Sequence, residues 1–316
     1  MKSEKCPAGF QLRHVLKANN RAVTRMAWSS DGRTLASASY DQTVRLWDTE
    51  SGTEIRELYG YSGSVFTVAI SPDGRYALSA SKSSLKVWDL TGETNTRTLR
   101  GHTDYIYAVA VTPDGRYAVS GAYDEKVKVW DLATDMERFT LGGHSGRISS
   151  VIVTPDSRTI ISGAADSKIM LWDVVEGVQQ TTLTGHTGEI LSLALDRDGR
   201  LLASASHDSD IRLWDVATGQ LTHVLAAHRK PVTAVSFASN GLLLASKSAD
   251  NSVRLWRRPV LETTAAWETV AVLTEPHSTF AFAGLAFHPE KPVLATLGDK
   301  DKVIRIWDLD FTTWVG

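Results

Sequence analysis

Short runs of apolar residues, separated by turn residues, recur along the whole chain. The stretch from 101 to 131 is the clearest case: apolar and other side chains alternate over 106–110, a Thr-Pro-Asp-Gly turn follows, and two more apolar runs cover 117–120 and 127–130. Alternation bounded by turn residues is typical of β-strands with one face buried. The pattern predicts three short strands in this unit and a fourth at 138–141, before the next Gly-His pair.

Tryptophan marks the repeat of this unit. Seven of the ten tryptophans are separated by 41, 42, 42, 42, 42 and 51 residues, and the same strand pattern surrounds them. Self-similarity at a fixed period indicates a repeat architecture. The seven residues are Trp47, Trp88, Trp130, Trp172, Trp214, Trp256 and Trp307.

A sheet of four short strands cannot bury both of its faces alone, so neighbouring sheets must cover it. Radial stacking meets this need and leaves only short edges, as in a β-propeller. Units that open on Gly-His and close on Trp-Asp resemble the WD-repeat family over residues 10–310. The resemblance implies an all-β, seven-bladed propeller of four-stranded antiparallel blades, with a short tail at 1–9 and a single WD-repeat domain at 10–316. Units this regular also resemble arrays appended to bacterial nucleotide-dependent switch proteins.

A ring of sheets needs a closure, because the first and last blades would otherwise expose unpaired edges. Only nine residues follow Trp307, too few for a fourth strand with its loop. The N-terminal stretch QLRHVLKAN, at 11–19, matches QLTHVLAAH, at 220–228, in six of nine positions, and the second stretch contains a fourth strand. We therefore expect the N-terminus to supply the fourth strand of the last blade.

Five units carry a histidine, a hydroxyl residue, an aspartate and the tryptophan at matching positions. A Ser/His/Asp trio suggests a hydrolase, but each active site would need its own cleft and oxyanion hole, which five identical trios round a ring cannot each have. In WD-repeat proteins the matching residues form a buried hydrogen-bond chain within each blade, and the resemblance implies that structural role here. The sets are His102, Ser120, Asp124, Trp130; His144, Ser162, Asp166, Trp172; His186, Ser204, Asp208, Trp214; His228, Ser246, Asp250, Trp256; and His277, Thr296, Asp301, Trp307.

The first two units depart from this pattern. The first has Asn19 at the histidine position, and the second has Tyr61 there and lacks the aspartate. Either the repeats have drifted because neighbouring blades still support them, or the loops were released for binding. In the sixth unit Arg257 replaces the aspartate after Trp256, and an insertion of about nine residues follows. It falls between the third and fourth strands, on the face opposite the Gly-His loops.

In WD-repeat proteins the residues that flank the first buried aliphatic of each unit point at the central channel, and the resemblance implies that these positions bind a partner here. A second candidate position precedes the network aspartate. Aromatic residues concentrate in the first three units, and exposed aromatic patches often mark interfaces. The opposing interpretation is that these rings pack together and fill the central channel. The predicted partner-binding residues are Tyr40, Tyr61, Phe66, Tyr105, Tyr107 and Tyr123, with Arg147, Glu189 and His207 further round the ring.

Charge and composition narrow the function classes. The formal charge is −2, from 34 basic and 36 acidic residues, so nucleic acid is not an expected partner. The single cysteine, Cys6, excludes an intrachain disulfide, and neither zinc spacing nor a phosphate-binding loop occurs, so no metal or cofactor is expected. No apolar run is long enough to span a bilayer, and the N-terminus lacks a signal-peptide pattern. These features favour a cytoplasmic protein, monomeric by itself and without a membrane partner.

We therefore expect a non-catalytic scaffold that binds a peptide or protein segment on the face bearing the channel mouth. A sensor or autoinhibitory domain of a larger signalling protein is the alternative, and an enzyme ranks third. A long upstream signalling region in the gene would favour the sensor.

Overall fold

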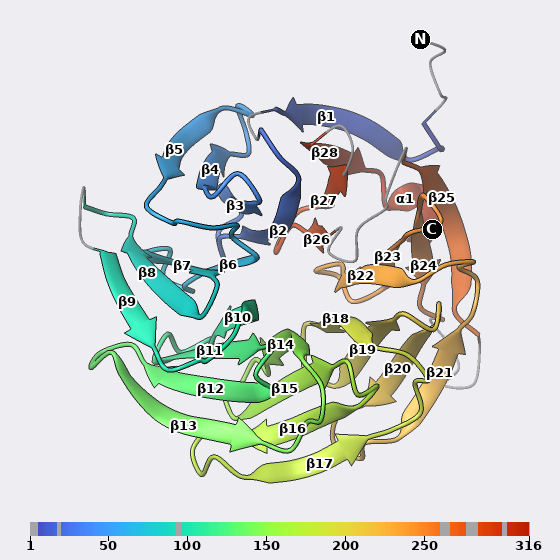
Figure 1. The fold of residues 1–316 in the computed structure, drawn as a ribbon. Coiled ribbons are helices and arrows are strands. Elements are labelled where there is room, and N and C mark those ends of the chain that lie inside the picture. Colours follow the sequence, from blue (N-terminus) through green and yellow to red (C-terminus); the bar gives the residue numbers. More distant parts are fainter. Residues whose placement is uncertain are drawn as a thin grey trace.

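The computed structural model describes residues 6–17, 20–92, 96–259, 266–275, 284–298 and 302–315. Its strands form seven four-stranded antiparallel sheets arranged as blades of a ring (Figure 1). The predicted fold class, a seven-bladed all-β propeller, is confirmed. None of the helices within the described ranges is long and apolar enough to cross a membrane.

Six of the blades place their strands in chain order from the centre of the ring outward. The first blade contains β2 (Val23–Trp28), β3 (Thr34–Ser39), β4 (Val44–Asp48) and β5 (Glu54–Leu58). The second contains β6 (Thr67–Ile70), β7 (Tyr76–Ser81), β8 (Ser84–Asp89) and β9 (Thr96–Arg100). The third contains β10 (Ile106–Val111), β11 (Tyr117–Ala122), β12 (Lys126–Asp131) and β13 (Met136–Gly142). The fourth contains β14 (Ile148–Val153), β15 (Thr159–Ala164), β16 (Ile169–Asp173) and β17 (Gln179–Leu183).

The remaining blades follow the same order except at the closure. The fifth contains β18 (Ile190–Leu195), β19 (Leu201–Ser206), β20 (Ile211–Asp215) and β21 (Leu221–Leu225). The sixth contains β22 (Val232–Phe237), β23 (Leu243–Ser248), β24 (Ser252–Arg257) and β25 (Glu268–Thr274). The seventh contains β26 (Leu285–Phe287), β27 (Val293–Gly298), β28 (Val303–Leu309) and, as its outer strand, β1 (Phe10–Leu16). The insertion after Trp256 lies between β24 and β25, as its position in the repeat predicts.

The hydrophobic core lies between neighbouring blades. One cluster joins Leu85 and Leu99 of the second blade to Ile106 and Trp130 of the third, all of them buried. The inner strands of these blades are in contact, as are those of other neighbours round the ring. Each apolar face is therefore covered by the next sheet, which removes the surface that an isolated blade would expose.

The tight turns between first and second strands explain the recurring Asp-Gly pair. Gly115 has φ +73°, a left-handed conformation that costs glycine little. The Asp114 carboxylate accepts hydrogen bonds from the Thr112 hydroxyl at 2.5 Å and from the Arg116 N–H at 3.0 Å. As expected from the sequence, these aspartates shape turns.

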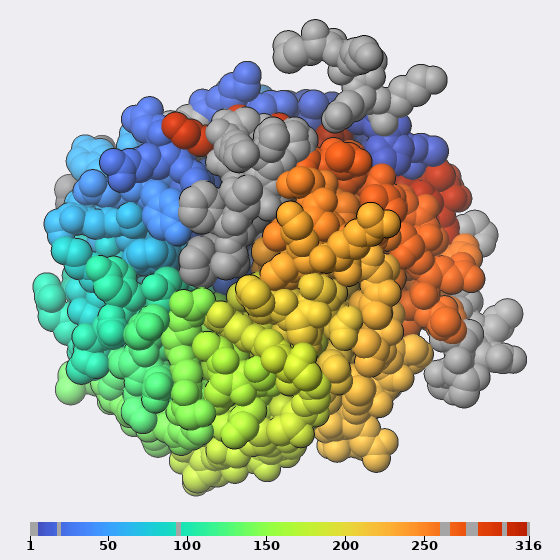
Figure 2. All heavy atoms as spheres, turned by 45° about the vertical axis from the view of Figure 1, so that its right-hand side comes forward, coloured from blue at the N-terminus to red at the C-terminus, as the bar shows by residue number. Residues whose placement is uncertain are grey.

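The N-terminal strand closes the ring. β1 pairs antiparallel with β28, with Gln11 opposite Asp308 and Leu12 opposite Trp307. The Arg13 guanidinium adds two hydrogen bonds to Asp308, at 3.0 and 2.5 Å. Figure 2 shows the blue N-terminal segment against the orange and red C-terminal segments at this junction.

The C-terminus reinforces the closure from the other side. After β28 the chain turns into the short helix α1 (Thr312–Val315), and the Trp314 ring packs on Phe10 at a centroid distance of 5.4 Å. Gly9 has φ +84°, and a Cβ there would lie 2.4 Å from the Trp314 ring. Glycine is thus required where the two ends of the chain approach each other.

Deleting residues 1–18 removes β1 and leaves one edge of β28 unpaired, while the other edge stays paired with β27. We expect the truncated protein to lose cooperative thermal unfolding in calorimetry and to aggregate, as followed by light scattering, because an exposed edge strand can pair with other chains. Deleting only residues 1–5 is the control and should melt like the full chain. A 1–18 deletion that also melts like the full chain would contradict the closure.

Candidate functional site

The His, Ser, Asp and Trp sets of the third to sixth blades form hydrogen-bond chains. The histidine precedes the inner strand, the serine lies on the second strand and the tryptophan lies on the third. The aspartate lies in the hairpin that joins the second strand to the third. Histidine Nδ1 lies 2.8, 2.9, 2.7 and 3.0 Å from the carboxylates of Asp124, Asp166, Asp208 and Asp250. Histidine Nε2 lies 2.8, 2.8, 2.8 and 2.7 Å from the hydroxyls of Ser120, Ser162, Ser204 and Ser246. The indole N–H groups donate to the same hydroxyls at 2.8 to 2.9 Å.

The direction of this chain follows from the protonation states. Burial lowers the pKa of His144, His186 and His228, so these imidazoles are neutral at pH 7. A neutral ring that donates from Nδ1 to the carboxylate keeps Nε2 as an acceptor for the serine hydroxyl. That hydroxyl in turn accepts the indole N–H, so each polar group of the chain itself has a partner.

The aspartate also ties the loop to the blade. Burial by itself would raise the pKa of Asp250, but hydrogen bonds from the Ser252 hydroxyl, His228 and the Arg229 N–H outweigh it and lower the pKa to about 2. The corresponding N–H after the histidine donates to Asp208 at 3.0 Å. The carboxylate therefore holds the Gly-His loop on the hairpin of the same blade.

These sets have no access to a substrate. Ser120, Ser162, Ser204 and Ser246 are 0% exposed and are already engaged by an indole and an imidazole. A nucleophilic serine needs an open site beside an oxyanion hole. The geometry therefore supports stabilisation of the blades. Within the described ranges, no three His, Cys, Asp or Glu side chains are grouped to hold a metal.

The first blade keeps part of the chain. The Trp47 indole donates to Ser37 at 2.9 Å, and Asp41 accepts from the Asn20 N–H at 3.1 Å. Asn19, at the predicted histidine position, lies outside the described residues.

The second blade replaces histidine with tyrosine. The Tyr61 hydroxyl lies 2.5 Å from the Ser79 carbonyl oxygen and 2.9 Å from the Ser79 hydroxyl, which also accepts the Trp88 indole N–H at 2.7 Å. Burial raises the pKa of Tyr61. The sequence predicts Tyr61 as a partner-binding residue, whereas the structure places its hydroxyl inside the second blade. Its ring reaches into the blade because a phenol can span the distance from the loop to the serine without an aspartate.

The seventh blade uses a different set. The Trp307 indole donates to Thr296 at 3.0 Å, and the Thr296 hydroxyl donates to the buried carboxylate of Glu275. Glu275 is also paired with the fully buried Lys247 of the sixth blade, with Nζ and Oε2 2.5 Å apart. His277 and Asp301, which were predicted for this network, lie outside the described residues.

Sequence reasoning missed Lys247 and Glu275. Two signals point to them: Lys247 occupies a second-strand position that is Ala38, Gly121, Gly163 or Ala205 in other blades, and Glu275 is an extra residue before the Pro-His pair. A charge at a position that holds a small apolar residue in the first and third to fifth blades requires a partner inside the protein.

Five of the predicted binding aromatics form one chain of ring contacts, here called the aromatic cluster. Phe66 lies at its centre, with ring centroids 5.9 Å from Tyr40, 5.5 Å from Tyr105 and 5.1 Å from Tyr107. Tyr123 is 6.4 Å from Tyr107. The rings pack on one another, yet Tyr105 and Tyr123 are 42% and 49% exposed. The cluster thus has packing inside and a free face outside.

Backbone geometry positions this cluster. The pairing of β10 with β11 shifts register between Ile106 and Ala108, so Tyr107 is the extra residue of a β-bulge. A bulge redirects a side chain out of the regular alternation. The Tyr123 N–H donates to the Tyr105 carbonyl at 2.7 Å, which fixes the hairpin beside the inner strand.

The predicted charged residues continue the arc into the fourth and fifth blades. The Arg147 guanidinium makes two hydrogen bonds of 2.8 Å to Glu189 and lies 5.8 Å from the Tyr107 ring centroid. Hydrogen bonding to Glu189 raises the pKa of Arg147. The exposed His207 lies beside them, with its N–H donating to the Glu189 carbonyl at 2.8 Å. The structure brings all these residues into one arc and leaves Tyr61 outside it.

The family model of the WD domain, G-beta repeat, matches seven segments of the chain: 10–48, 52–89, 93–131, 136–173, 177–215, 219–257 and 267–308. The chain belongs to the WD40 repeat family. The first segment begins with β1, the strand that completes the last blade of this WD40 propeller.

Curated relatives match single repeats or pairs of repeats. A stretch of 48 residues is 46% identical to rat Coronin-7 (Rattus norvegicus) and covers 15% of this chain and 5% of that protein. A stretch of 42 residues is 57% identical to the F-box-like/WD repeat-containing protein TBL1X of Mus musculus, covering 13% and 8%. A stretch of 79 residues is 39% identical to the U5 small nuclear ribonucleoprotein 40 kDa protein of Mus musculus, covering 25% and 21%. These relatives are eukaryotic and do not support the bacterial resemblance.

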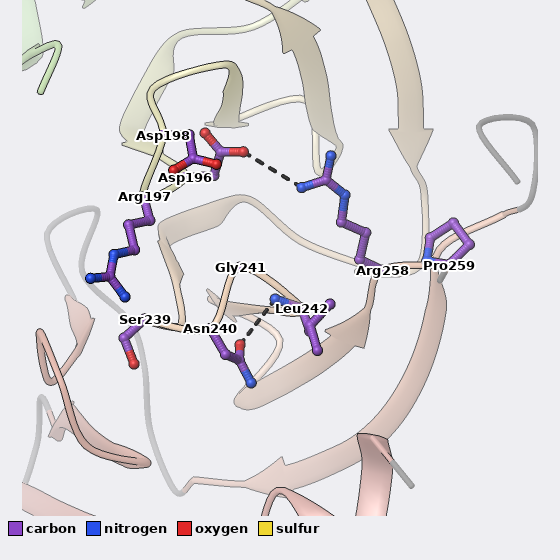
Figure 3. A pocket seen from close by; sticks show the side chains of 9 residues that line it. All are labelled: Asp196, Arg197, Asp198, Ser239, Asn240, Gly241, Leu242, Arg258 and Pro259. Atoms are coloured by element: carbon purple, nitrogen blue, oxygen red, sulfur yellow. Dashed lines mark hydrogen bonds and ion pairs between the residues drawn. The ribbon is translucent and has the colours of Figure 1, made fainter. Parts of the chain in front are cut away.

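This WD40 propeller also has a pocket beside the turns between first and second strands, with a volume of 370 Å³ (Figure 3). It lies between the β18–β19 turn, the β22–β23 turn and the start of the insertion after β24. Asp196 accepts the N–H groups of Arg200 and Leu201 and is 3.5 Å from Arg258. The Asp196 carboxylate is thus already neutralised and hydrogen-bonded, so it is not available to select a ligand in this pocket.

Replacing His186 with Ala leaves Ser204 and Asp208 without their shared partner inside the fifth blade. We expect a loss of about 3 kcal/mol in the free energy of unfolding. Thermal and urea unfolding measure it. His207→Ala, which removes an exposed histidine of the same blade, should leave stability unchanged. Equal stability of the two variants would contradict the structural role of the network.

The lowered histidine pKa values make stability depend on pH. In the unfolded chain these histidines titrate near pH ~6.5, whereas the folded blades hold His144, His186 and His228 neutral to lower pH. The unfolded state then binds more protons below that pH, so the melting temperature should fall as pH decreases through ~6.5 and stay level above it. Nitrogen-detected NMR at pH 6 should find the three rings neutral and protonated on Nδ1. Imidazolium signals from these rings at pH 6 would overturn the assignment.

Proposed function

We propose that this WD40 propeller is a non-catalytic scaffold that binds a peptide or protein segment at the mouth of the central channel, through the aromatic cluster. WD40 propellers typically act as protein-interaction scaffolds, and the regular blades here serve to hold loops in place. The observation that carries the proposal is the continuous cluster of five rings with two exposed tyrosines.

Aromatic side chains suit this role because they offer large apolar area with few rotatable bonds. The rings in the cluster hold one another in place through edge-to-face contacts, such as the 90° contact between Phe66 and Tyr105. A partner segment therefore meets a surface that is already ordered, which lowers the entropic cost of binding.

The Arg147–Glu189 pair forms the charged border of this surface. Arg147 Nε and Nη2 each donate a hydrogen bond to one carboxylate oxygen of Glu189, so the two charges are already paired before a partner binds. Its contribution to affinity is expected to be small beside that of the rings, because paired rim charges gain little on binding.

Truncating Tyr105 or Tyr107 to Ala should each weaken binding of the partner segment by about 2 kcal/mol, because each removes a ring from the centre of the contact. The partner is first identified by affinity capture and mass spectrometry, and a synthetic segment is then titrated by calorimetry. The melting temperature should change by only about 2 °C.

Tyr59→Ala is the matched control for these variants. Tyr59 is 76% exposed and lies outside the aromatic cluster, so its loss should not change affinity. Equal losses in the Tyr59, Tyr105 and Tyr107 variants, or a collapse of stability in the last two, would rule out the cluster as a discrete binding site.

A further inference from the structure

Arg25 is the single charged residue of the seven inner strands β2, β6, β10, β14, β18, β22 and β26 as the structure bounds them. These strands surround the centre of the ring (Figure 1). The corresponding position in other blades is small: Thr67, Ala108, Ser150, Ser192 and Ala234. Arg25 is therefore a long, charged side chain at an inner-strand position where these other blades have short, uncharged ones.

The side chain reaches across the ring. Arg25 belongs to the first blade, yet its Nη2 donates to the Ser149 carbonyl of the fourth blade at 3.0 Å and to the Leu191 carbonyl of the fifth at 3.4 Å. Arg147 and Glu189 come immediately before β14 and β18, and Ser149 and Leu191 lie two residues after them. Two strand residues span ~6.6 Å, so the guanidinium lies just beneath the charged border of the mouth.

The charge of Arg25 has no counterion within the described residues. Its hydrogen-bond acceptors are neutral carbonyls, and its Nε is buried without a partner. Burial lowers its pKa to about 10, and no nearby charge opposes this effect. Glu189, the acidic residue of the border above, is already paired with Arg147. The segment 276–283, PHSTFAFA, contains no acidic residue.

We propose that Arg25 receives an anionic oxygen group, a carboxylate or a phosphate, that the partner segment inserts into the channel mouth. A guanidinium recognises both groups through the same planar donors. Arg25 is partly buried, and holding its charge there without a counterion costs free energy, which an incoming anion relieves where no side chain of the inner strands does. The inference rests on the proposed function, and it names the chemistry of one group that the partner segment carries.

Inorganic phosphate and acetate are the probes, each compared with chloride at the same ionic strength. The wild-type protein should show a saturable rise in melting temperature and a saturable shift of an arginine Nε–H NMR signal with at least one of the two anions. A response to phosphate alone identifies a phosphate group, and a response to acetate identifies a carboxylate. No saturable response to either anion in the wild-type protein would overturn the proposal, whatever the variants do.

Arg25→Gln keeps an amide donor for the two carbonyls but removes the charge. The variant should bind the responding anion at least ~10-fold more weakly, because a charge-assisted hydrogen bond is lost. Arg33→Gln is the matched control, because Arg33 is exposed on a turn of the same blade. If Arg25→Gln does not fold, Arg25→Lys retains the charge without the fork and should bind with intermediate affinity. Equal anion affinity in the wild-type protein and the folded Arg25 variant would assign the anion to another site.

The two proposals fail separately. Tyr105→Ala should keep the anion response, because the ring does not bond to Arg25, so loss of partner binding in that variant reports on the aromatic cluster alone. Arg25→Gln should weaken the partner segment by at least ~10-fold as well. An unchanged partner affinity in Arg25→Gln, with the cluster variants impaired, would separate the anion from the partner and refute this inference while leaving the proposed function intact.

Discussion

The whole structure depends on covering two apolar faces of each small sheet. A blade of four short strands has a core only because its neighbours supply the other half of it, as where Trp130 of the third blade packs with Leu85 and Leu99 of the second. Every blade needs a neighbour on each side, so the ring must be complete to be stable. The pairing of β1 with β28 is therefore as important as any core contact, although it joins residues at opposite ends of the chain.

Inside the blades, one element stays constant while the others vary. In all seven blades the third-strand tryptophan donates its indole N–H to a second-strand hydroxyl, serine in six blades and Thr296 in the seventh. The partner of that hydroxyl changes from histidine to Tyr61 in the second blade and to Glu275 in the seventh. The requirement is that each buried polar atom finds a partner, and several side chains meet it. The family signature is thus one solution to a problem of hydrogen bonding.

The surface of the ring is free to vary because the networks hold its loops. The aromatic cluster lies on the first three blades, and the Arg147–Glu189 pair joins the fourth and fifth. Arg25 crosses beneath that border and contributes the single charge of the inner strands. The proposals on binding concern this asymmetry, since a symmetric scaffold by itself selects no partner.

The sequence by itself determined the number of blades, the order of their strands and the closure by the N-terminus. These features depend on local signals that repeat, namely the alternation of apolar and polar residues, the turn residues and the spacing of tryptophans such as Trp130 and Trp172. Because each signal recurs in every unit, the set predicts the fold more strongly than any one signal does. The sequence also placed the network residues of the third to sixth blades and the five rings of the aromatic cluster on their strands and loops. Only the tertiary structure decided that Tyr61 points into its blade, that Lys247 pairs with Glu275, and that Arg25 reaches Ser149 and Leu191. Each of these contacts depends on the length of one side chain and on the distance between residues that are far apart in the chain, and the pattern of the repeats carries neither quantity.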